Sequence, residues 1–265
     1  MQLEGKRAVV LGAAGKDNMG QVIARRLIDE GAKVVVAGRK PEFLDEFAAA
    51  HPGKGFKALC DITKKEDNDA LAKSAVDQIG GVDIAINATG WGFLKPFLET
   101  TAEELQQISD LQFKGPFLFF QSMIEVMKDG GSLIQISSAT ATIMLNDHAA
   151  YMGTKAGTDH VMRCIANEFG DRGIRANSIS PGLTETPMTA ANGKTPGLWE
   201  AFVPSYPMGR VGTSDDIAAA AVWLSTDECF MTGQNLQVNG GLTLRRNPWK
   251  HEIQASVVAA MQAAQ

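Results

Sequence analysis

The chain has 265 residues, of which 45% are hydrophobic and 21% are charged, a balance that is typical of globular proteins and excludes a disordered one. Its net charge of −5 offers no basic face, so we expect no nucleic-acid partner. The apolar runs, such as 32–37, are too short to cross a bilayer, and a strand-like run at 8–11 leaves no room for the apolar core of a signal peptide. We therefore expect a cytoplasmic protein without membrane association.

Short β-branched runs alternate with longer amphipathic segments along the chain. Such alternation predicts an α/β fold in which helices cover both faces of a parallel sheet. In chain order, strands are expected at 8–11, 33–37, 56–60, 84–87, 132–137, 176–180 and 234–238. Helices are expected at 20–30, 41–50, 65–79, 102–128, 151–170 and 215–225.

Two regions fall outside this alternation. Residues 188–208 mix Pro, Gly and Asn with aromatic side chains, which favours a mobile lid over a substrate site. Residues 245–265 form a C-terminal extension with an alanine-rich helix, which is either a solvated tail or a subunit contact because its large apolar residues recur at near-helical spacing. No repeat or polar linker divides the chain, so we expect one domain over 1–265.

A glycine-rich loop, with Gly12, Gly15 and Gly20, joins the first expected strand to the first helix. Glycines in such a turn let the backbone approach a pyrophosphate, whose charge then meets the positive end of the helix dipole. On its own this spacing is a weak signal, and an ordinary strand–helix turn is the alternative. The strand before the loop and the helix after it favour a dinucleotide site.

The end of the second expected strand predicts the choice of cofactor. Gly38, Arg39 and Lys40 stand where a protein that binds the 2′-hydroxyl of NAD(H) normally presents Asp or Glu. A guanidinium pairs well with a 2′-phosphate, so we expect NADP(H) in preference to NAD(H). The alternative is that both cations are simply the solvated start of the next helix. Asp61 follows the third strand and is either an adenine contact or a turn residue.

Tyr151 and Lys155 are four residues apart, so both side chains leave one face of the expected helix. A nearby ammonium favours the phenolate and should lower the pKa of Tyr151 toward the range that acid/base catalysis needs. Ser138 follows the fifth strand, where its hydroxyl is able to bind a substrate oxygen. Together these residues predict proton transfer to or from a substrate oxygen.

With these motifs, nearly the whole chain resembles the short-chain dehydrogenase/reductase family. The matching blocks are 12–20, Cys60-Asp61-Ile62-Thr63, Asn87-Ala88-Thr89-Gly90, Ser137-Ser138, 151–155, 177–182 with Thr186, and Val238-Asn239-Gly240-Gly241. The resemblance implies a Rossmann-type, doubly wound parallel sheet of seven strands, a Ser-Tyr-Lys catalytic set, and a homotetramer or dimer. It also implies that Lys155 bonds the nicotinamide ribose. The cofactor contacts expected in all are Gly12, Gly15, Gly20, Arg39, Asp61, Asn87, Gly90, Tyr151, Lys155, Pro181, Gly182 and Thr186.

The chain departs from this family at two places that concern catalysis. The glycine loop is two residues longer than usual, a feature shared with enoyl reductases, but those enzymes place six residues between Tyr and Lys instead of three. Gln112 stands where the family has the Asn that completes its catalytic set. We hypothesise that Gln112 keeps a proton relay through a displaced water, and the alternative is that it only packs in the helix.

Hydride transfer between a nicotinamide and a carbonyl or secondary alcohol is therefore the expected function, with a cofactor-binding scaffold or an enoyl reductase-like activity as alternatives. Scattered cysteines and isolated histidines indicate no metal site. Apolar side chains predict a medium or bulky apolar small-molecule substrate, although each is equally able to fill the core. The candidates for the substrate wall are Trp91, Phe93, Met144, His148, Met188, Trp199 and Phe202.

Overall fold

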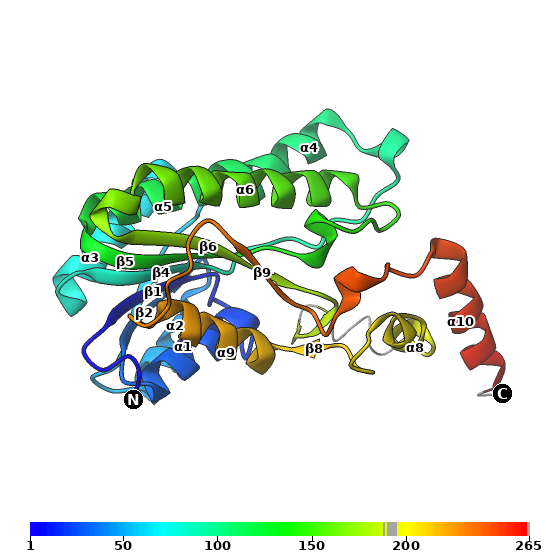
Figure 1. Cartoon of the computed structure of the whole chain (residues 1–265), viewed down its shortest axis with the longest axis horizontal. Helices are drawn as coiled ribbons and strands as arrows, with labels where there is room; N and C mark the ends of the chain where they lie inside the picture. The colour runs from blue at the N-terminus through cyan, green and yellow to red at the C-terminus, as the bar shows by residue number, and fades with distance from the viewer. Residues whose placement is uncertain (188, 190–194, 264–265) are drawn as a thin grey trace.

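Seven parallel strands form the centre of the computed structural model, which describes residues 1–187, 189 and 195–263 (Figure 1). Their order is β3-β2-β1-β4-β5-β6-β9, with parallel pairing throughout. This confirms the expected Rossmann-type sheet. The strands are β1 (Arg7–Leu11), β2 (Lys33–Gly38), β3 (Gly55–Leu59), β4 (Val82–Asn87), β5 (Met127–Ile136), β6 (Ile174–Pro181) and β9 (Asn235–Val238).

Helices cover both faces of the sheet because successive strand residues point to opposite sides. Ala8 and Val10 of β1 pack on one side, against α1 (Met19–Asp29), α2 (Pro41–Ala50) and α9 (Ser214–Ser225). Val9 and Leu11 pack on the other side. That side is covered by α3 (Lys65–Ile79), α5 (Gly115–Val126) and α6 (Ala149–Glu168), with α4 (Ala102–Ser109) beside α6 (Figure 1).

The single helix expected at 102–128 is wrong in two respects. Between α4 and α5 lies a π-helical segment, η2 (Asp110–Lys114), in which the N–H of Gly115 donates to the carbonyl of Asp110. The helix then ends at Val126, and β5 begins at Met127 instead of Ser132, with a register shift against β4.

Apart from η4 (Gly170–Arg172), which leads into the amino end of β6, the remaining elements gather around the carboxyl end of the sheet. The lid region contains α8 (Leu198–Phe202), and α10 (Lys250–Ala263) packs against it at the end of the molecule (Figure 1). Met188, one of the expected substrate contacts, lies outside the described residues. The short elements are η1 (Phe97–Glu99), η3 (Ala139–Ala141), η4 (Gly170–Arg172), β7 (Thr184–Glu185), η5 (Val203–Ser205), β8 (Gly212–Thr213) and η6 (Leu242–Leu244).

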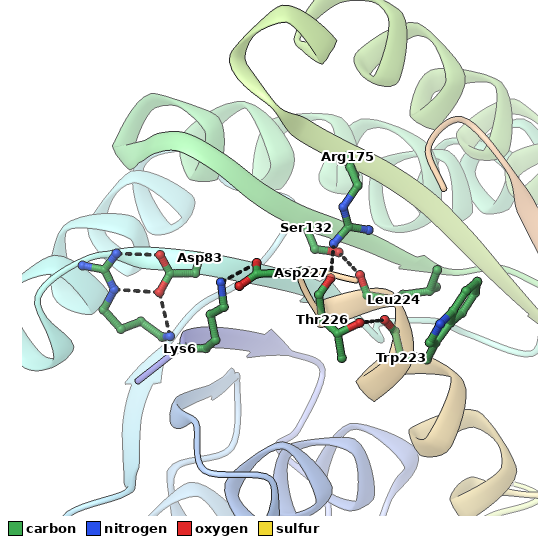
Figure 2. A network of polar contacts seen from close by, with 9 residues as sticks. Lys6, Asp83, Ser132, Arg175, Trp223, Leu224, Thr226 and Asp227 are labelled. Carbon is green, nitrogen blue, oxygen red and sulfur yellow. Dashed lines mark hydrogen bonds and ion pairs between the residues drawn. The ribbon is translucent and has the colours of Figure 1, made fainter. Parts of the chain in front are cut away.

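Polar contacts tie the amino end of the sheet to the chain that leaves α9 (Figure 2). Lys6 pairs with Asp227 at 2.7 Å, and the Oγ of Ser132 donates to the carbonyl of Leu224 at 2.8 Å. Arg175 donates to the carbonyl of Thr226 at 3.0 Å. These contacts hold together the end of the sheet that is opposite the cavity described below. Within the described residues, no helix has both the length and the apolar character needed to cross a membrane.

Candidate active site

A cavity of about 740 Å³ lies at the carboxyl ends of the central strands, where ligands bind in open α/β sheets. Its wall includes Ile136 at the end of β5 and Pro181 at the end of β6, and α8 and α10 also contribute. The structure brings together most of the expected site residues here. Those that line the cavity are Gly12, Gly20, Gly90, Trp91, Ser138, His148, Tyr151, Lys155, Pro181, Gly182, Thr186, Trp199 and Phe202.

Helix α6 presents Tyr151 and Lys155 to the cavity one turn apart. Lys155 is only 3% exposed, and its Nζ donates to the carbonyl of Ile136 at 2.8 Å. The same Nζ lies 5.6 Å from the centroid of the Tyr151 ring. The end of β5 therefore fixes the ammonium beside the phenol.

Burial controls the acidity of both groups. It lowers the pKa of the Lys155 ammonium to about 8, while the charge of Asp159 acts in the opposite direction. It raises the pKa of the Tyr151 phenol, against a hydrogen bond with Ser138 that lowers it. We expected the ammonium to lower the pKa of Tyr151. For the protein alone this is wrong, because loss of water around the phenolate dominates and the charge of Asp159 raises the pKa of Tyr151 further.

The hydroxyl of Ser138 is held at the start of η3. It accepts from the backbone N–H of Thr140 at 3.2 Å and shares a hydrogen bond with the Thr140 hydroxyl at 2.8 Å. Thr140 also lines the cavity, and sequence reasoning missed it. The signal was the Ser-x-Thr spacing after a strand, which is typical of a turn closed by a side-chain hydroxyl.

Gln112 lies in η2, is 2% exposed, and has both ends of its amide engaged. Its Oε1 accepts from the backbone N–H of Trp91 at 2.7 Å, and its Nε2 donates to Oγ1 of Thr154 at 3.1 Å. A Cβ placed on Gly90 would lie 3.5 Å from that Oε1 and 3.8 Å from Nζ of Lys155. The amide thus joins the loop after β4 to helix α6. The proton relay stays a prediction.

The glycine loop forms a cradle that side chains would fill. Gly12 has a φ of +99°, and a Cβ there would lie 2.6 Å from the backbone of Ala88. A Cβ on Gly20 would lie 2.6 Å from the carbonyl of Gly12. Asn18, which sequence reasoning missed, donates from Nδ2 to that carbonyl at 2.8 Å and caps α1 with Oδ1. Because the amino end of α1 opens beside glycine backbone, these residues fit a dinucleotide pyrophosphate.

The expected adenosine contacts lie at the ends of β2 and β3, outside the described cavity wall. Arg39 and Lys40 are exposed, and Arg39 makes no ion pair within the described part of the chain. Asp61 accepts from the N–H of Thr63 at 3.1 Å and from its hydroxyl at 2.8 Å. Burial raises the pKa of Asp61. These hydrogen bonds and the charge of Arg39 lower it, and together they hold the pKa below its usual value.

Several expected contacts lie behind the cavity or away from it. Asn87 is fully buried, donates to Gln135 at 2.9 Å, and accepts from the N–H of Thr89 at 3.0 Å, so it supports the turn after β4. Phe93 is buried against Trp91, and Met144 is 61% exposed. The expected residues that the described wall does not include are Gly15, Arg39, Asp61, Asn87, Phe93, Gln112 and Met144.

The C-terminal extension contributes to the wall, which sequence reasoning did not foresee. Nζ of Lys250 bonds Oδ2 of Asp147 at 2.5 Å, and Ser256 of α10 donates to the carbonyl of Gly197 at 2.7 Å. Ile253 and Gln254 line the cavity. The near-helical spacing of apolar residues in this tail indicated burial, and α8 provides part of it within the same chain.

The chain is similar to known proteins over most of its length. Residues 12–243 match the family model described as "Enoyl-(Acyl carrier protein) reductase". The 3beta-hydroxysteroid dehydrogenase 1 of Eggerthella lenta is 36% identical over 250 residues, covering 91% of this chain and 95% of that protein. The D-threitol dehydrogenase of Mycolicibacterium smegmatis is 32% identical over 254 residues, covering 92% of this chain and 95% of that protein.

A solved structure is also similar. A short-chain type dehydrogenase/reductase from Mycobacterium ulcerans has a TM-score of 0.88 and 28% sequence identity, covering 94% of this chain and 93% of that one. A family model that spans 12–243, together with relatives of nearly equal length, assigns this chain to the short-chain dehydrogenase/reductase family of nicotinamide-dependent oxidoreductases.

Proposed function

We propose that the protein transfers a hydride between NADP(H) and a carbonyl or secondary alcohol, with Tyr151 as acid and base. The bound nicotinamide supplies the acceptor or donor of the hydride. In the oxidation direction an alcohol loses its O–H proton to Tyr151 and the hydrogen on its carbon as hydride, which yields a carbonyl, reduced cofactor and one released proton. Reduction is the reverse.

The observation that carries this proposal is that Ser138, Tyr151 and Lys155 line the same cavity as Gly12 and Gly20. Ser138, fixed by its contacts with Thr140, holds the substrate oxygen. Tyr151 gives or takes the proton, and Lys155 adds positive charge and a donor for the nicotinamide ribose. Asp61 is assigned to adenine, and the cavity residues Pro181, Gly182 and Thr186 are assigned to the carboxamide.

The preference for NADP(H) is supported by the exposed Arg39 and Lys40 at the start of α2. Replacing Gly38 by Asp, the natural way to favour NAD(H), would fail because a Cβ there lies 2.5 Å from Cβ of Ala14. Arg39→Asp avoids this clash. We expect it to lower kcat/KM with NADPH by at least tenfold, and Arg26→Asp on the neighbouring helix to leave the cofactor ratio unchanged. An unmodified enzyme that used NADH equally well would contradict the assignment.

An apolar alcohol or ketone of medium to large size is the proposed substrate. Trp91, Phe202 and Ile253 surround the substrate half of the cavity. The hydroxysteroid in the name of one relative supports this class, whereas the sugar alcohol in the name of the other is small and polar. These names describe the relatives alone, and the two compounds that they contain share a secondary hydroxyl group.

The test is turnover of ketones and secondary alcohols, followed by the absorbance of reduced nicotinamide with both cofactors. We expect activity that Tyr151→Phe lowers by more than ~10²-fold in kcat, with the Kd for cofactor nearly unchanged, because only the transferable proton is lost. Tight cofactor binding without any turnover would favour a scaffold. Turnover of an enoyl thioester alone would favour the activity that the family model is named for, although only three residues separate Tyr151 from Lys155.

We further propose that one domain forms each subunit of a cytoplasmic homotetramer or dimer. Apolar side chains on the α4–α5 side support association, since Leu105, Phe113 and Phe117 are 48%, 41% and 49% exposed. Light scattering after size exclusion measures the mass directly, and a monomer at micromolar concentration would contradict this proposal.

A further inference from the structure

The hydroxyl group of Ser138 has one proton to donate and two lone pairs that accept. One lone pair accepts from the backbone N–H of Thr140 at 3.2 Å. The second contact, with the Thr140 hydroxyl at 2.8 Å, allows either group to be the donor. If Thr140 donates, both lone pairs of Ser138 are filled and its proton is free for an oxygen in the cavity. If Ser138 donates, its proton is not available to the cavity.

The surroundings of Thr140 favour the first direction. Thr140 is only 9% exposed, and within the described residues its hydroxyl has no hydrogen-bond partner besides Ser138. The hydroxyl of Thr142, in the same turn, instead donates to the carbonyl of Ala139 at 2.9 Å. Buried hydroxyl groups are nearly always paired, so the Thr140 proton belongs on the oxygen of Ser138.

The Ser138 proton, in contrast, has an acceptor on the cavity side. Ser138 bonds the phenol of Tyr151 and lowers the pKa of that phenol, as a donor to the phenolate does. Both residues line the cavity. The backbone of Ser138 is held separately, because its carbonyl accepts from Oγ of Ser180 at 3.2 Å and from the N–H of Ala141 at 3.0 Å. The hydroxyls of Thr140, Ser138 and Tyr151 therefore form a chain that ends where the proton is transferred.

We propose that Thr140 is a positioning residue, whose hydroxyl donates to Ser138 and thereby directs the Ser138 proton onto the reacting oxygen. This inference rests on the proposed function. A carbonyl oxygen gains negative charge as hydride arrives, and a donor that is already aimed at it stabilises this charge without reorganisation. Hydrogen bonds in a chain polarise one another, so donation from Thr140 strengthens donation from Ser138. An alcohol oxygen also accepts from Ser138, because its own proton goes to Tyr151.

Thr140→Val keeps the shape of the side chain and replaces its hydroxyl with a methyl group. We expect kcat to fall about tenfold, less than the ~10²–10³-fold loss of a complete donor to a developing oxyanion, with the Kd for cofactor nearly unchanged. Thr140→Ser restores the hydroxyl and should recover most of the loss. The opposite direction of the hydrogen bond predicts the opposite result, because Thr140→Val would then release the Ser138 proton and raise kcat.

A double-mutant cycle separates this role from a purely structural one. In the Ser138→Ala background no proton is left to direct, so Thr140→Val should lower kcat no further. A role in packing alone would lower kcat by the same factor in both backgrounds. The matched control is Thr142→Val, at an exposed residue of the same turn that the described cavity wall does not include. It should keep the kcat of the unmodified enzyme.

A titration of the Tyr151 phenol tests the inference without turnover. In the protein alone the Ser138 proton meets the oxygen of Tyr151. Thr140→Val should therefore raise the pKa of Tyr151, by at most about one pH unit, which corresponds to one ordinary hydrogen bond. Ser138→Ala should raise it at least as much, and adding Thr140→Val to Ser138→Ala should raise it no further.

The absorbance of the phenolate follows this titration. The chain contains only two tyrosines, so the transition that disappears in Tyr151→Phe identifies the phenol in question. Burial raises the pKa of the other, Tyr206, to about 12. The charged and aromatic groups beside the phenol are the same in the Thr140 and Ser138 variants, namely Lys155, Asp159 and His148.

The two measurements fail separately. Absence of turnover with every ketone and alcohol would overturn the proposed function, and the phenol titration would still decide the inference. A pKa of Tyr151 that rises in Thr140→Val but not in Thr142→Val supports it. An unchanged or lower pKa in Thr140→Val, an unchanged kcat, or equal losses of kcat in both backgrounds of the cycle would overturn it.

Discussion

Asp159 carries a partly buried carboxyl one turn beyond Lys155 on α6, and the proposed chemistry gives it no direct part. Its Oδ2 accepts from Ser137 at 2.8 Å and from Nδ2 of Asn235 at 2.6 Å, which links α6 to β9 and to the residue after β5. Burial raises its pKa, while these hydrogen bonds and the charge of Lys155 lower it. In return, its charge raises the pKa of Lys155 and of Tyr151.

We predict that Asp159→Asn moves the alkaline limb of the pH profile of kcat/KM to lower pH. Asn keeps the size of the side chain and removes the charge, so the pKa of Lys155 should fall below its value of about 8. In the proposed mechanism the ammonium form of Lys155 is the active one, so activity is then lost at a lower pH. Asn235→Ala, which removes a hydrogen bond but no charge, should leave the limb in place. Superimposable profiles for Asp159→Asn and the unmodified enzyme would refute this prediction.

At the scale of elements, the π-helical segment η2 turns Gln112 inward between the loop after β4 and helix α6. Its amide spans the 2.7 Å contact with Trp91 and the 3.1 Å contact with Thr154. The Thr158 hydroxyl donates a hydrogen bond to the backbone carbonyl of Gln112 at 2.7 Å. π-Helical turns are often found at functional sites, and this one joins α6 to the loop after β4 beside the cavity.

Gln112→Ala should lower kcat about tenfold, equivalent to ~1.4 kcal/mol, and should lower the free energy of unfolding by ~1–3 kcal/mol because the N–H of Trp91 loses its buried acceptor. Gln112→Asn should be tolerated better. A relay adds an effect that varies with pH, whereas a purely structural tether lowers kcat equally at all pH values. Wild-type kcat for Gln112→Ala across the pH range would remove Gln112 from the mechanism.

Local patterns predicted most elements well. The helix at 65–79 has the expected limits, and Tyr151 and Lys155 share a helix face because spacing alone fixes that geometry. The break at 110–114 was not predictable, since it depends on the packing of Gly115, where a Cβ would lie 3.0 Å from Ile62. Asp159 was likewise missed because its partners come from strands distant in the sequence.

The packing partner of helix α10 was also not predictable from local sequence patterns. Its apolar periodicity indicated burial, but no local signal named α8 as the partner. The extension reaches the cavity through Ile253 and Gln254 and is anchored by the pair of Lys250 with Asp147. It therefore closes the substrate half of the site and leaves the glycine cradle untouched.

Truncation after Leu244 should raise KM for bulky alcohols about tenfold, with the Kd for NADP(H) unchanged, because apolar wall is lost only on the substrate side. Lys250→Ala should have a smaller effect of the same kind, since a partly exposed ion pair contributes ~0–1 kcal/mol. Steady-state kinetics with small and large alcohols, beside a fluorescence titration of cofactor, measure both. Equal KM values in full-length and truncated protein would show that α10 does not form the wall.

Across the whole molecule, the sheet separates an end held by ion pairs from the end that carries the cavity. At the amino end, Arg7 pairs with Asp83 at 2.6 Å with both side chains about three-quarters buried. Lys6 pairs with Asp227, whose side chain is 83% exposed. The cavity lies at the opposite ends of the same strands, so changes to these pairs should affect stability and leave the chemistry alone.

Asp83→Asn tests this separation. Burial raises the pKa of Asp83, but hydrogen bonds from Arg7 lower it more and hold it below the usual range. A carboxyl with a lowered folded pKa stabilises the protein above its unfolded pKa of ~3.9, and that contribution disappears as the pH falls through the folded pKa. We therefore expect Asp83→Asn to lower the free energy of unfolding by ~1–3 kcal/mol at pH 7 and by progressively less below pH ~4.

The matched control is Asp227→Asn, which should lower the free energy of unfolding by ~0–1 kcal/mol at every pH tested, because its ion pair with Lys6 is exposed to solvent. Denaturant unfolding at several pH values measures the free energies, and steady-state assays on the same samples measure kcat. A loss of kcat in Asp83→Asn at full occupancy of the folded state would mean that the two ends of the sheet are coupled. A stability difference that persisted at low pH would instead assign it to packing, because only a charge effect is removed by protonation.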